Sequence, residues 1–421
     1  MGGSGRKSAP PSPTSGRRRL PAAFRALRVS EAVSSAGSQL TLVALPVLAA
    51  ADLDASASQI ALLSGAQFVP VLLVTPFAGR LADLRDRAPL LYASHFARAV
   101  VLFLVVGLAA AGWLDYLTLF AGAMLLGAFT ALFDTSLLAY VPDTVETEEL
   151  TRANGQLAAV NAVSQTAGPA IGGLIVSGLG PALAVALDAV SYLFGGAALR
   201  ARRKPSHSRA AREGASIRAG FTTVAASDPL RRLVAAGSLF NLAEQVALSV
   251  LFIAVVQESA HSVGFLGFGF SAAGVGSVIG ARASARYGGG DAARSWVWAL
   301  LVSQAALLAA LWAVGSGLWG AAAFFASMLV YGAAMAFYNV HSLTRRQLVS
   351  PDGMLGRVNA VYRTFAFGTI PIGAGAAALL LLFTTAPVAA SLVAVLSVVA
   401  TWVLARGTYT TERRDEAWTT P

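Results

Sequence analysis

The stretch GRLADLRDR, residues 79–87, is a short charged loop between two long apolar runs. Arginine-bearing gaps like it recur at every second interruption of the apolar runs. The intervening gaps, such as Asp52–Asp54 and Gly112–Asp115, hold no Lys or Arg. Short loops rich in Lys and Arg stay on the cytoplasmic side of a membrane. The alternation therefore predicts twelve membrane spans, with both termini and five internal loops on the cytoplasmic side and six short loops outside.

The composition fits this topology. The chain is 56% hydrophobic and 12% charged, whereas soluble proteins are about half apolar and about a quarter charged. Each crossing needs about 20 apolar residues, so twelve crossings use most of the 421 residues. The net charge of +10 is compatible with nucleic-acid binding, but attraction of scattered loop arginines to an anionic inner leaflet explains it better. The absence of cysteine excludes disulfides, thiolate zinc sites and cysteine nucleophiles.

The spans fall into two groups of six. An N-terminal arm (1–23) is expected to be disordered and cytoplasmic, and it precedes a six-helix bundle (24–200). A cytoplasmic central loop (201–229) leads to a second six-helix bundle (230–406) and a cytoplasmic tail (407–421). Helices are the default because an unpaired backbone in lipid costs several kcal/mol. The predicted spans are Val29–Ala51, Ser58–Leu81, Pro89–Ala111, Leu114–Val141, Arg152–Ser177, Pro181–Leu199, Leu230–Val256, Val263–Arg286, Ser295–Val314, Leu318–Leu343, Leu355–Phe383 and Ala386–Ala405.

The two halves repeat one another. Gly79-Arg-Leu-Ala-Asp83 follows the second span, and Gly280-Ala-Arg-Ala-Ser284 follows the eighth. A Pro-Asp pair and an Arg-x-Asn triplet lead into both the fifth and the eleventh span. The pattern predicts a duplicated six-helix unit, as many secondary transporters have. In the central loop, the mixed polarity of Ile217–Val224 predicts a segment that lies along the membrane surface.

The loop after the second span combines a small residue with charges of both signs. Its residues Gly79, Asp83, Arg85, Asp86 and Arg87 are candidates for a charge clasp that holds two helices in one conformation. The alternative is ordinary solvated loop charge.

Ionisable residues inside membrane spans are costly and are therefore functional candidates. Asp134 and Glu244 are candidates for binding a proton or a cationic substrate, because a desolvated carboxylate can load and release a proton near neutral pH. Arg98, Asp188 and Arg363 are read first as partners in buried ion pairs, and Arg98 is expected to pair with Asp134.

Polar amides accompany these charges along several spans. Asn241 and Gln245 flank Glu244, and Gln39, Gln67, Asn161, Gln165, Gln304 and Asn339 occur in other spans. As a set they predict a wet path through the protein. A single amide of this kind more often forms a hydrogen bond between two helices.

Small residues mark two further places. Gly168, Pro169, Gly172 and Gly173 in the fifth span allow close helix approach and a bend, which favours a moving pair of helices. The stretch starting at Gly267 matches a G-x-G-x-x-A nucleotide fingerprint, but it follows no strand and is read as helix packing. His95, His207, His261 and His341 are too scattered for a metal site, and no cofactor is expected.

These motifs resemble the major facilitator superfamily from about residue 24 to residue 406. Residues 79–87 resemble its loop signature, with Leu84 where a basic residue is usual. Gly168-Pro169-x-x-Gly172-Gly173 resembles its antiporter motif. The stretches Phe133-Asp134, Leu150-Thr-Arg-Ala-Asn154, Leu187-Asp188-Ala-Val-Ser191 and Asp228-Pro-Leu230 are similar to a drug/proton antiporter subgroup that includes macrolide and enterobactin exporters. Many of its members carry an Asp after the glycine of the first span, where Ser38 follows Gly37 here.

The resemblance implies a monomeric inner-membrane secondary transporter of twelve helices. It would export a drug-like, antibiotic or siderophore-like small molecule by alternating access, in exchange for protons. An uptake symporter on the same fold and a non-transporting membrane receptor are the alternatives. A membrane enzyme is disfavoured because no catalytic cluster stands at an interface.

Overall fold

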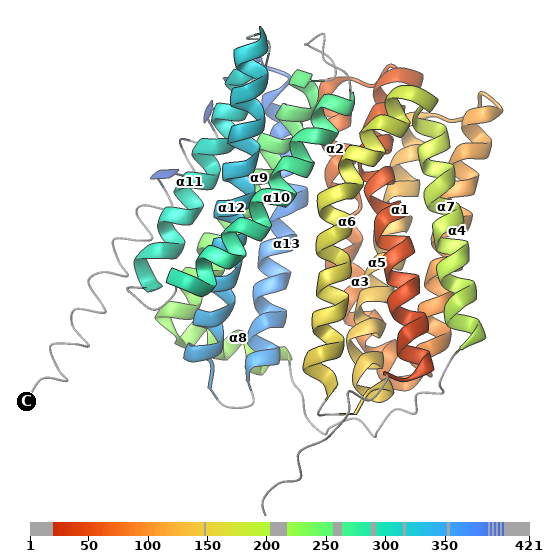
Figure 1. Ribbon diagram of the computed structural model, residues 1–421, viewed down its shortest axis with the longest axis vertical. Coiled ribbons are helices and arrows are strands. Elements are labelled where there is room, and N and C mark those ends of the chain that lie inside the picture. Colours follow the sequence, from red (N-terminus) through yellow and green to blue (C-terminus); the bar gives the residue numbers. More distant parts are fainter. Residues whose placement is uncertain are drawn as a thin grey trace, which may run out of the picture.

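A computed structural model describes residues 20–146, 149–202, 217–255, 263–287, 292–314, 317–351 and 354–385, with a few positions between 388 and 399. These residues form helices and no strand (Figure 1). The helices are α1 (Ala22–Asp52), α2 (Ala57–Ala66), α3 (Val69–Leu84), α4 (Arg87–Ala110), α5 (Tyr116–Thr144), α6 (Leu150–Leu179), α7 (Pro181–Ala201), α8 (Ile217–Ala226), α9 (Asp228–Ile253), α10 (Val263–Tyr287), α11 (Ala292–Ala313), α12 (Gly317–Val349) and α13 (Leu355–Leu380).

The predicted all-helical membrane fold is confirmed. Within the described part of the chain, nine helical segments are long and apolar enough to cross a membrane, and α11 adds a shorter apolar helix, Val297–Ala313. The number twelve is consistent with this finding but is not established by it. The predicted last span (386–405), the N-terminal arm up to residue 19 and the tail (407–421) lie outside the described elements.

Helix α6 is long enough to span a membrane but is too polar to be one of the nine segments. Its residues up to 165 include Arg152, Asn154, Gln156, Asn161 and Gln165. A helix with this polarity is stable at membrane depth when its polar side faces protein or water. This is the first indication that α6 borders an aqueous space.

The predicted second span is two helices. The chain turns at Gln67 and Phe68, and Pro70 occupies the first turn of α3. Proline has no N–H and its ring clashes with the preceding turn, so α2 ends before it. Helix α5 packs closely against this turn at Gly127. A Cβ at that position would collide with the backbone of Gln67.

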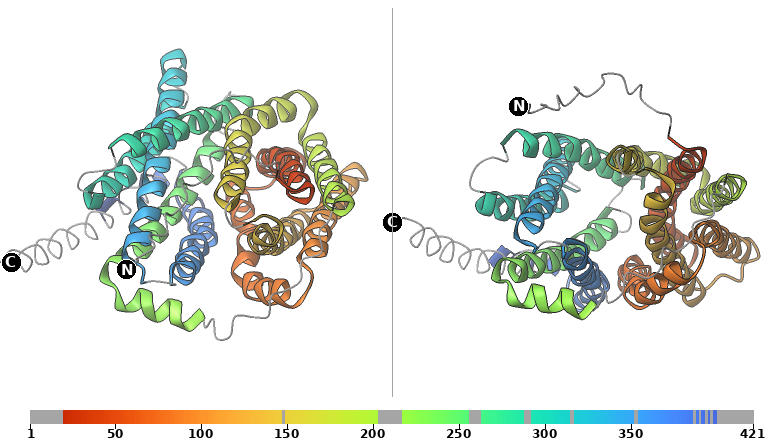
Figure 2. Two further views of the ribbon diagram at one scale, coloured as in Figure 1. Left: turned by 60° about the horizontal axis from the view of Figure 1, so that its bottom comes forward. Right: turned by 90° about the horizontal axis from the view of Figure 1, so that it is seen from below.

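The helices group into two halves that meet at two places. In the first half α1 packs on α6 and α7, and α4 packs on α5 and α7; in the second half α12 packs on α10 and α11, and α13 packs on α9. The halves join where α2 packs on α13 and where α6 packs on α10 (Figure 2). The expected domain boundaries remain predictions.

The linker between the halves ends in α8, at the place where a surface segment was predicted. Helix α8 packs on α13 and, less extensively, on α9. Phe221 meets Phe365 edge-on at 5.9 Å between ring centroids, and a Cβ at Gly220 would touch Arg357. The helix is therefore fixed to the second half.

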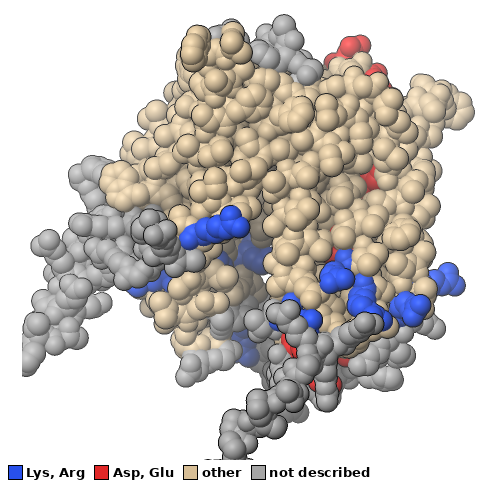
Figure 3. Space-filling model, viewed as in Figure 1, with Lys and Arg blue, Asp and Glu red and all other residues tan. Residues whose placement is uncertain are grey.

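Charge is distributed unequally between the two ends of the bundle. One end holds Arg85 and Arg87 beside the starts of α6 and α9, and we call it the basic end. The other end holds Asp52, Asp54 and Asp115, and we call it the acidic end. Figure 3 shows the basic side chains in the lower part of the molecule, with some acidic atoms among them, and acidic atoms without basic ones at the top. At the acidic end Asp115 caps α5, and hydrogen bonds from Thr118 lower the pKa of this carboxyl.

Among the described residues, an apolar cluster joins the two halves only at the acidic end. One cluster contains residues of α1, α2, α4, α5 and α7 together with residues of α9 to α13, including Leu45, Val250 and Phe324. Toward the basic end the clusters are separate: one belongs to the first half and two belong to the second. A hollow lies between the halves in the lower part of the molecule (Figure 3). This cleft opens toward the basic end.

Candidate functional site

Arg98 is the buried cation of the first half. It lies on α4 and is 5% exposed. Its Nη2 is 3.1 Å from His95 Nδ1, and its Nε donates to the carbonyl of Ser94 at 3.4 Å. The guanidinium lies 4.6 Å from the ring centroid of Phe133 and 4.3 Å from that of Tyr192. Cation–π contacts of this kind stabilise a desolvated guanidinium, so Arg98 is held in place without a direct carboxylate contact among the described residues.

Three carboxylates surround this one arginine. Glu31 on α1 lies close to the amide of Asn161 on α6, and it feels the charges of Asp134 and Arg98. Asp134 on α5 is attracted by Arg98, and so is Asp188 on α7. The expected pairing of Arg98 with Asp134 thus takes the form of a longer-range attraction. One positive charge faces three acidic groups in a poorly solvated interior, an arrangement in which the acids cannot all ionise without cost.

Asp188 is enclosed by hydroxyl groups. It accepts hydrogen bonds from Thr41 at 2.5 Å and from Ser191 at 3.0 Å, and it is 1% exposed. Gly37 on α1 makes room for it, because a Cβ there would collide with Ser191 and Asp188. The residue after Gly37, Ser38, hydrogen-bonds to the Tyr192 hydroxyl at 2.7 Å. Asp188 is therefore sealed between α1 and α7, away from the cleft.

Glu31 and Asp134 differ from Asp188 because they are partly exposed. Asp134 is also attracted by Arg363, which belongs to α13 in the other half. Attraction across the halves requires Asp134 to face the cleft. Glu31 in turn feels the charge of Asp134, so these two partly exposed carboxylates lie near one another.

The second half carries its own polar cluster on α9 and α12. The Tyr331 hydroxyl donates a short hydrogen bond to Glu244. Asn241 donates to the carbonyl of Ala366 on α13 at 2.8 Å, and Gln245 donates to Ser249 at 3.1 Å. Asn241 therefore ties α9 to α13, whereas the hydrogen bond of Gln245 stays within α9; Glu244 is the ionisable group among them.

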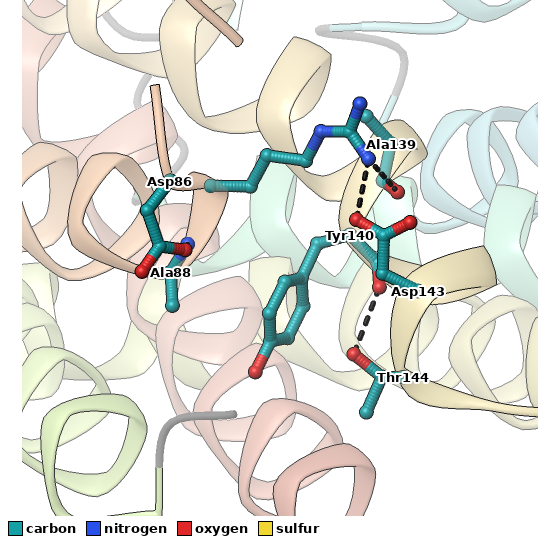
Figure 4. A network of polar contacts seen from close by, with 7 residues as sticks. Asp86, Ala88, Ala139, Tyr140, Asp143 and Thr144 are labelled. Carbon is teal, nitrogen blue, oxygen red and sulfur yellow. Dashed lines mark hydrogen bonds and ion pairs between the residues drawn. The ribbon is translucent and has the colours of Figure 1, made fainter. Parts of the chain in front are cut away.

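The charged loop forms a clasp with a partner that the sequence analysis did not assign to it (Figure 4). Arg87 pairs with Asp143 near the end of α5, and it donates to the carbonyl of Ala139 at 3.2 Å. Asp86 accepts from the backbone N–H of Ala88 at 3.1 Å and so caps α4, whereas Arg85 is exposed. The clasp joins α4 to α5 within one half. The side chains of Gly79 and Asp83 lie outside the described part of the chain.

The small residues of α6 pack against two neighbours. Gly168 and Gly172 face Gln39 and Leu40 on α1, so the amide stem of Gln39 lies against α6. Gly173 faces Gly264 and Gly267 on α10, and Gly267 lies against the carbonyl of Pro169. The G-x-G-x-x-A stretch is thus used for helix packing. Beside Pro169, the N–H of Ala170 donates to Ser271 of α10 at 3.2 Å, which adds a polar link between the halves.

The other amides behave differently from one another. Gln165 and Asn339 are exposed, and Asn161 lies at the site beside Glu31. Gln304 is 3% exposed, and its side chain makes no hydrogen bond to a described residue. The wet path predicted from these amides as a set remains a prediction.

Glu31, Asp143 and Tyr331 were missed by the sequence analysis. Glu31 stands near the edge of the predicted first span, in a stripe of Ser30, Ser34 and Ser38 at helical spacing. That stripe is the signal that could have revealed it. No local pattern links Asp143 or Tyr331 to its partner.

Solved structures with this arrangement of helices are membrane transporters. The nucleoside transporter NupG has a TM-score of 0.72 at 13% identity, over 91% of this chain and 98% of that one. A bacterial homologue of the iron transporter ferroportin, in an inward-facing state, has a TM-score of 0.68 at 16% identity, also over 91% and 98%. At these identities the likeness shows the fold alone. The fold is that of a major facilitator transporter, a multi-pass integral membrane protein.

Sequence comparison assigns the family. The family model described as transmembrane secretion effector matches residues 19–416. The chain therefore belongs to the transmembrane secretion effector family of this superfamily. An uncharacterized MFS-type transporter of Bacillus subtilis (strain 168), YfiS, is 27% identical over 171 residues, which are 41% of this chain and 38% of that protein. The match thus spans less than half the length of this curated relative.

Proposed function

We propose that this transporter exports an amphipathic, drug-like small molecule by alternating access, in exchange for protons. The observation that carries the proposal is the pair of partly exposed carboxylates, Glu31 and Asp134, that lies close to Arg98. Such a pair binds a proton or a cationic group, and these two compete for the same negative charge. Competition at a shared site is the simplest physical basis for exchange.

Orientation follows from the charges of the two ends. The basic end is the cytoplasmic end, since arginine-rich loops stay inside. The cleft of this structure then opens to the cytoplasm, where a molecule to be exported would enter. A lipophilic cation suits this cleft, because Glu31 and Asp134 can offer it negative charge.

Asp134→Asn should abolish uptake of a fluorescent lipophilic cation such as ethidium into inverted membrane vesicles that are acidified inside. The substitution keeps the shape of the side chain but removes the group that exchanges a proton. The measurement is fluorescence quenching on acidification and its reversal by a protonophore.

Asp52→Asn is the matched control, because Asp52 is exposed at the acidic end and should be replaceable without loss. Equal transport by Asp134→Asn and by the unmodified chain, at equal expression, would remove Asp134 from the mechanism. Transport that requires the opposite gradient would favour uptake.

A second measurement tests the orientation. The chain contains no cysteine, so single cysteines report without background. Trp113→Cys, 78% exposed at the acidic end, should react with a membrane-impermeant maleimide in intact cells, whereas Arg85→Cys should react only in inverted vesicles. The reverse pattern would invert the topology and the proposed direction.

A further inference from the structure

Asp134 and Arg363 carry opposite charges on opposite halves of the molecule. Asp134 is attracted by Arg98 within its own half and by Arg363 across the cleft. Neither Asp134 nor Arg363 forms an ion pair with a described residue in this conformation, in which the basic end is open. The two groups attract one another without touching.

The two arginines near Asp134 differ in freedom. Arg98 is fixed by His95, by the carbonyl of Ser94 and by two aromatic rings. Arg363 is exposed, and its one described contact is with the Phe367 ring, whose centroid is 5.4 Å from the guanidinium carbon. Arg363 can therefore change its contact partner at little free-energy cost, whereas Arg98 cannot.

The depths of the two side chains match. With a rise of about 1.5 Å per residue, Asp134 lies about 15 Å along α5 from the basic end, and Arg363 about 12 Å along α13. The halves share an apolar cluster at the acidic end and separate clusters toward the basic end. Rocking about the shared cluster would therefore bring these two residues together.

We propose that Asp134 and Arg363 form a direct ion pair when the basic end closes, and that protonation of Asp134 prevents this pair. Closing the cleft removes water from both groups. A desolvated arginine without a carboxylate partner is strongly unfavourable. In the ion pair, the attraction between the two charges offsets the cost of desolvation. The ionised carboxylate thus stabilises the closed basic end, and the protonated one favours the open basic end.

The other groups that face Asp134 are compatible with this switch. Arg98 and His95 approach from α4, and Glu31 approaches from α1. The described side chains of α2 and α3, which also pack near α5, include no ionisable group. Arg98 is present in both conformations, so the change in charge around Asp134 comes from Arg363.

This inference deepens the proposed function, because a proton arriving from outside would break the ion pair and open the transporter inward. It rests on alternating access but not on the identity of the substrate. Its test therefore measures the conformation of the protein without any substrate. A failure of ethidium transport can then be distinguished from a failure of the ion pair.

The experiment measures the width of the basic end with spin labels on cysteines. Phe77→Cys on α3 and Leu348→Cys on α12, which are 73% and 74% exposed, place one label in each half of the otherwise Cys-free chain. In detergent or nanodiscs, a shorter distance should gain population at alkaline pH and lose it at acid pH. Asp134→Asn and Arg363→Gln should each reduce the short-distance population about tenfold or more at alkaline pH, as expected for loss of a charge-assisted contact.

The double variant decides between pairing and independent roles. Asp134→Asn with Arg363→Gln should behave like either single variant, because a contact can be lost only once. Arg363→Lys should retain the short distance, and Arg357→Gln, on the same helix, should leave it unchanged. If Asp134→Asn does not fold, the contrast between Arg363→Gln and Arg363→Lys still decides the question, since Arg363 is exposed. Retention of the pH-dependent short distance in Arg363→Gln, or additive effects in the double variant, would overturn the proposal.

Discussion

A missing side chain at Gly37 shapes the interior of the first half. The space is filled by the Asp188 carboxylate and the Ser191 hydroxyl, which form the polar seam between α1 and α7. The drug/proton antiporter subgroup that the sequence resembles has an Asp after this glycine in many members, whereas this chain has Ser38 there. In this chain, acidic charge near the seam comes from Asp188 on α7 and from Glu31 lower on α1.

Gly37→Ala should destabilise the protein by about 1–3 kcal/mol, because the added methyl group overpacks a well-filled interior. The apparent melting temperature of purified protein in detergent measures this loss. Gly107→Ala on α4 is the control, since no atom lies within 4 Å of a Cβ built there. Equal melting temperatures for the two variants would show that the seam can relax around the methyl group.

The residues of the site were partly visible in the sequence. Asp134, Arg98, Asp188 and Glu244 stand out because ionisable groups within apolar runs are rare. Glu31 did not stand out, because it lies where a span begins and where loop charge is ordinary. Their positions relative to one another could not be predicted. Helix periodicity indicates on which face of a helix a residue lies, but not which residue of another helix lies opposite to it.

At the scale of elements, α6 joins the two halves. Its glycines face α1 on one side and α10 on the other, and Ser177 near its end accepts a hydrogen bond from the N–H of Gly264 at 3.0 Å. Close backbone approach of this kind depends on small residues in membrane helices. The contact between α6 and α10 therefore sets how tightly the acidic end closes.

Gly267→Leu should loosen the acidic end. A side chain there collides with the carbonyl of Pro169 and pushes α10 away from α6. A cysteine at Ser177 should then react several-fold faster with an impermeant thiol reagent applied from the acidic end. Gly155→Leu, on α6 in open space, should leave the rate unchanged; an equal acceleration in both variants would mean that α6 itself had been disturbed.

Element boundaries were predicted well where composition changes sharply and less well where backbone chemistry decides. The predicted span Pro181–Leu199 is close to α7, which begins at a proline after Gly180. The break between α2 and α3 was missed although Pro70 was visible, because a proline within an apolar run is also compatible with a continuous kinked helix. Only the packing of Gly127 against the turn distinguishes the two outcomes.

At the scale of the whole molecule, the fold class was predictable and the conformation was not. Hydropathy, loop charge and the internal repeat indicate a duplicated helical bundle. They are the same in every state of a transporter that rocks between two openings. Which end is open depends on contacts between the halves, such as Ser58 with the carbonyl of Ala378 and Ala170 with Ser271. Single residues far apart in the chain make these contacts, so no periodic pattern in the sequence predicts them.

The apolar cluster shared by the two halves at the acidic end has a thermal consequence. To open that end, the cluster must part and admit water, and the water must leave again in every cycle. Hydration of apolar surface carries a large heat capacity. The free-energy difference between the two conformations must therefore curve with temperature, even when no charge changes. Cooling weakens the cohesion of that cluster, so the balance between inward and outward openings depends on the temperature of the membrane as well as on the proton gradient.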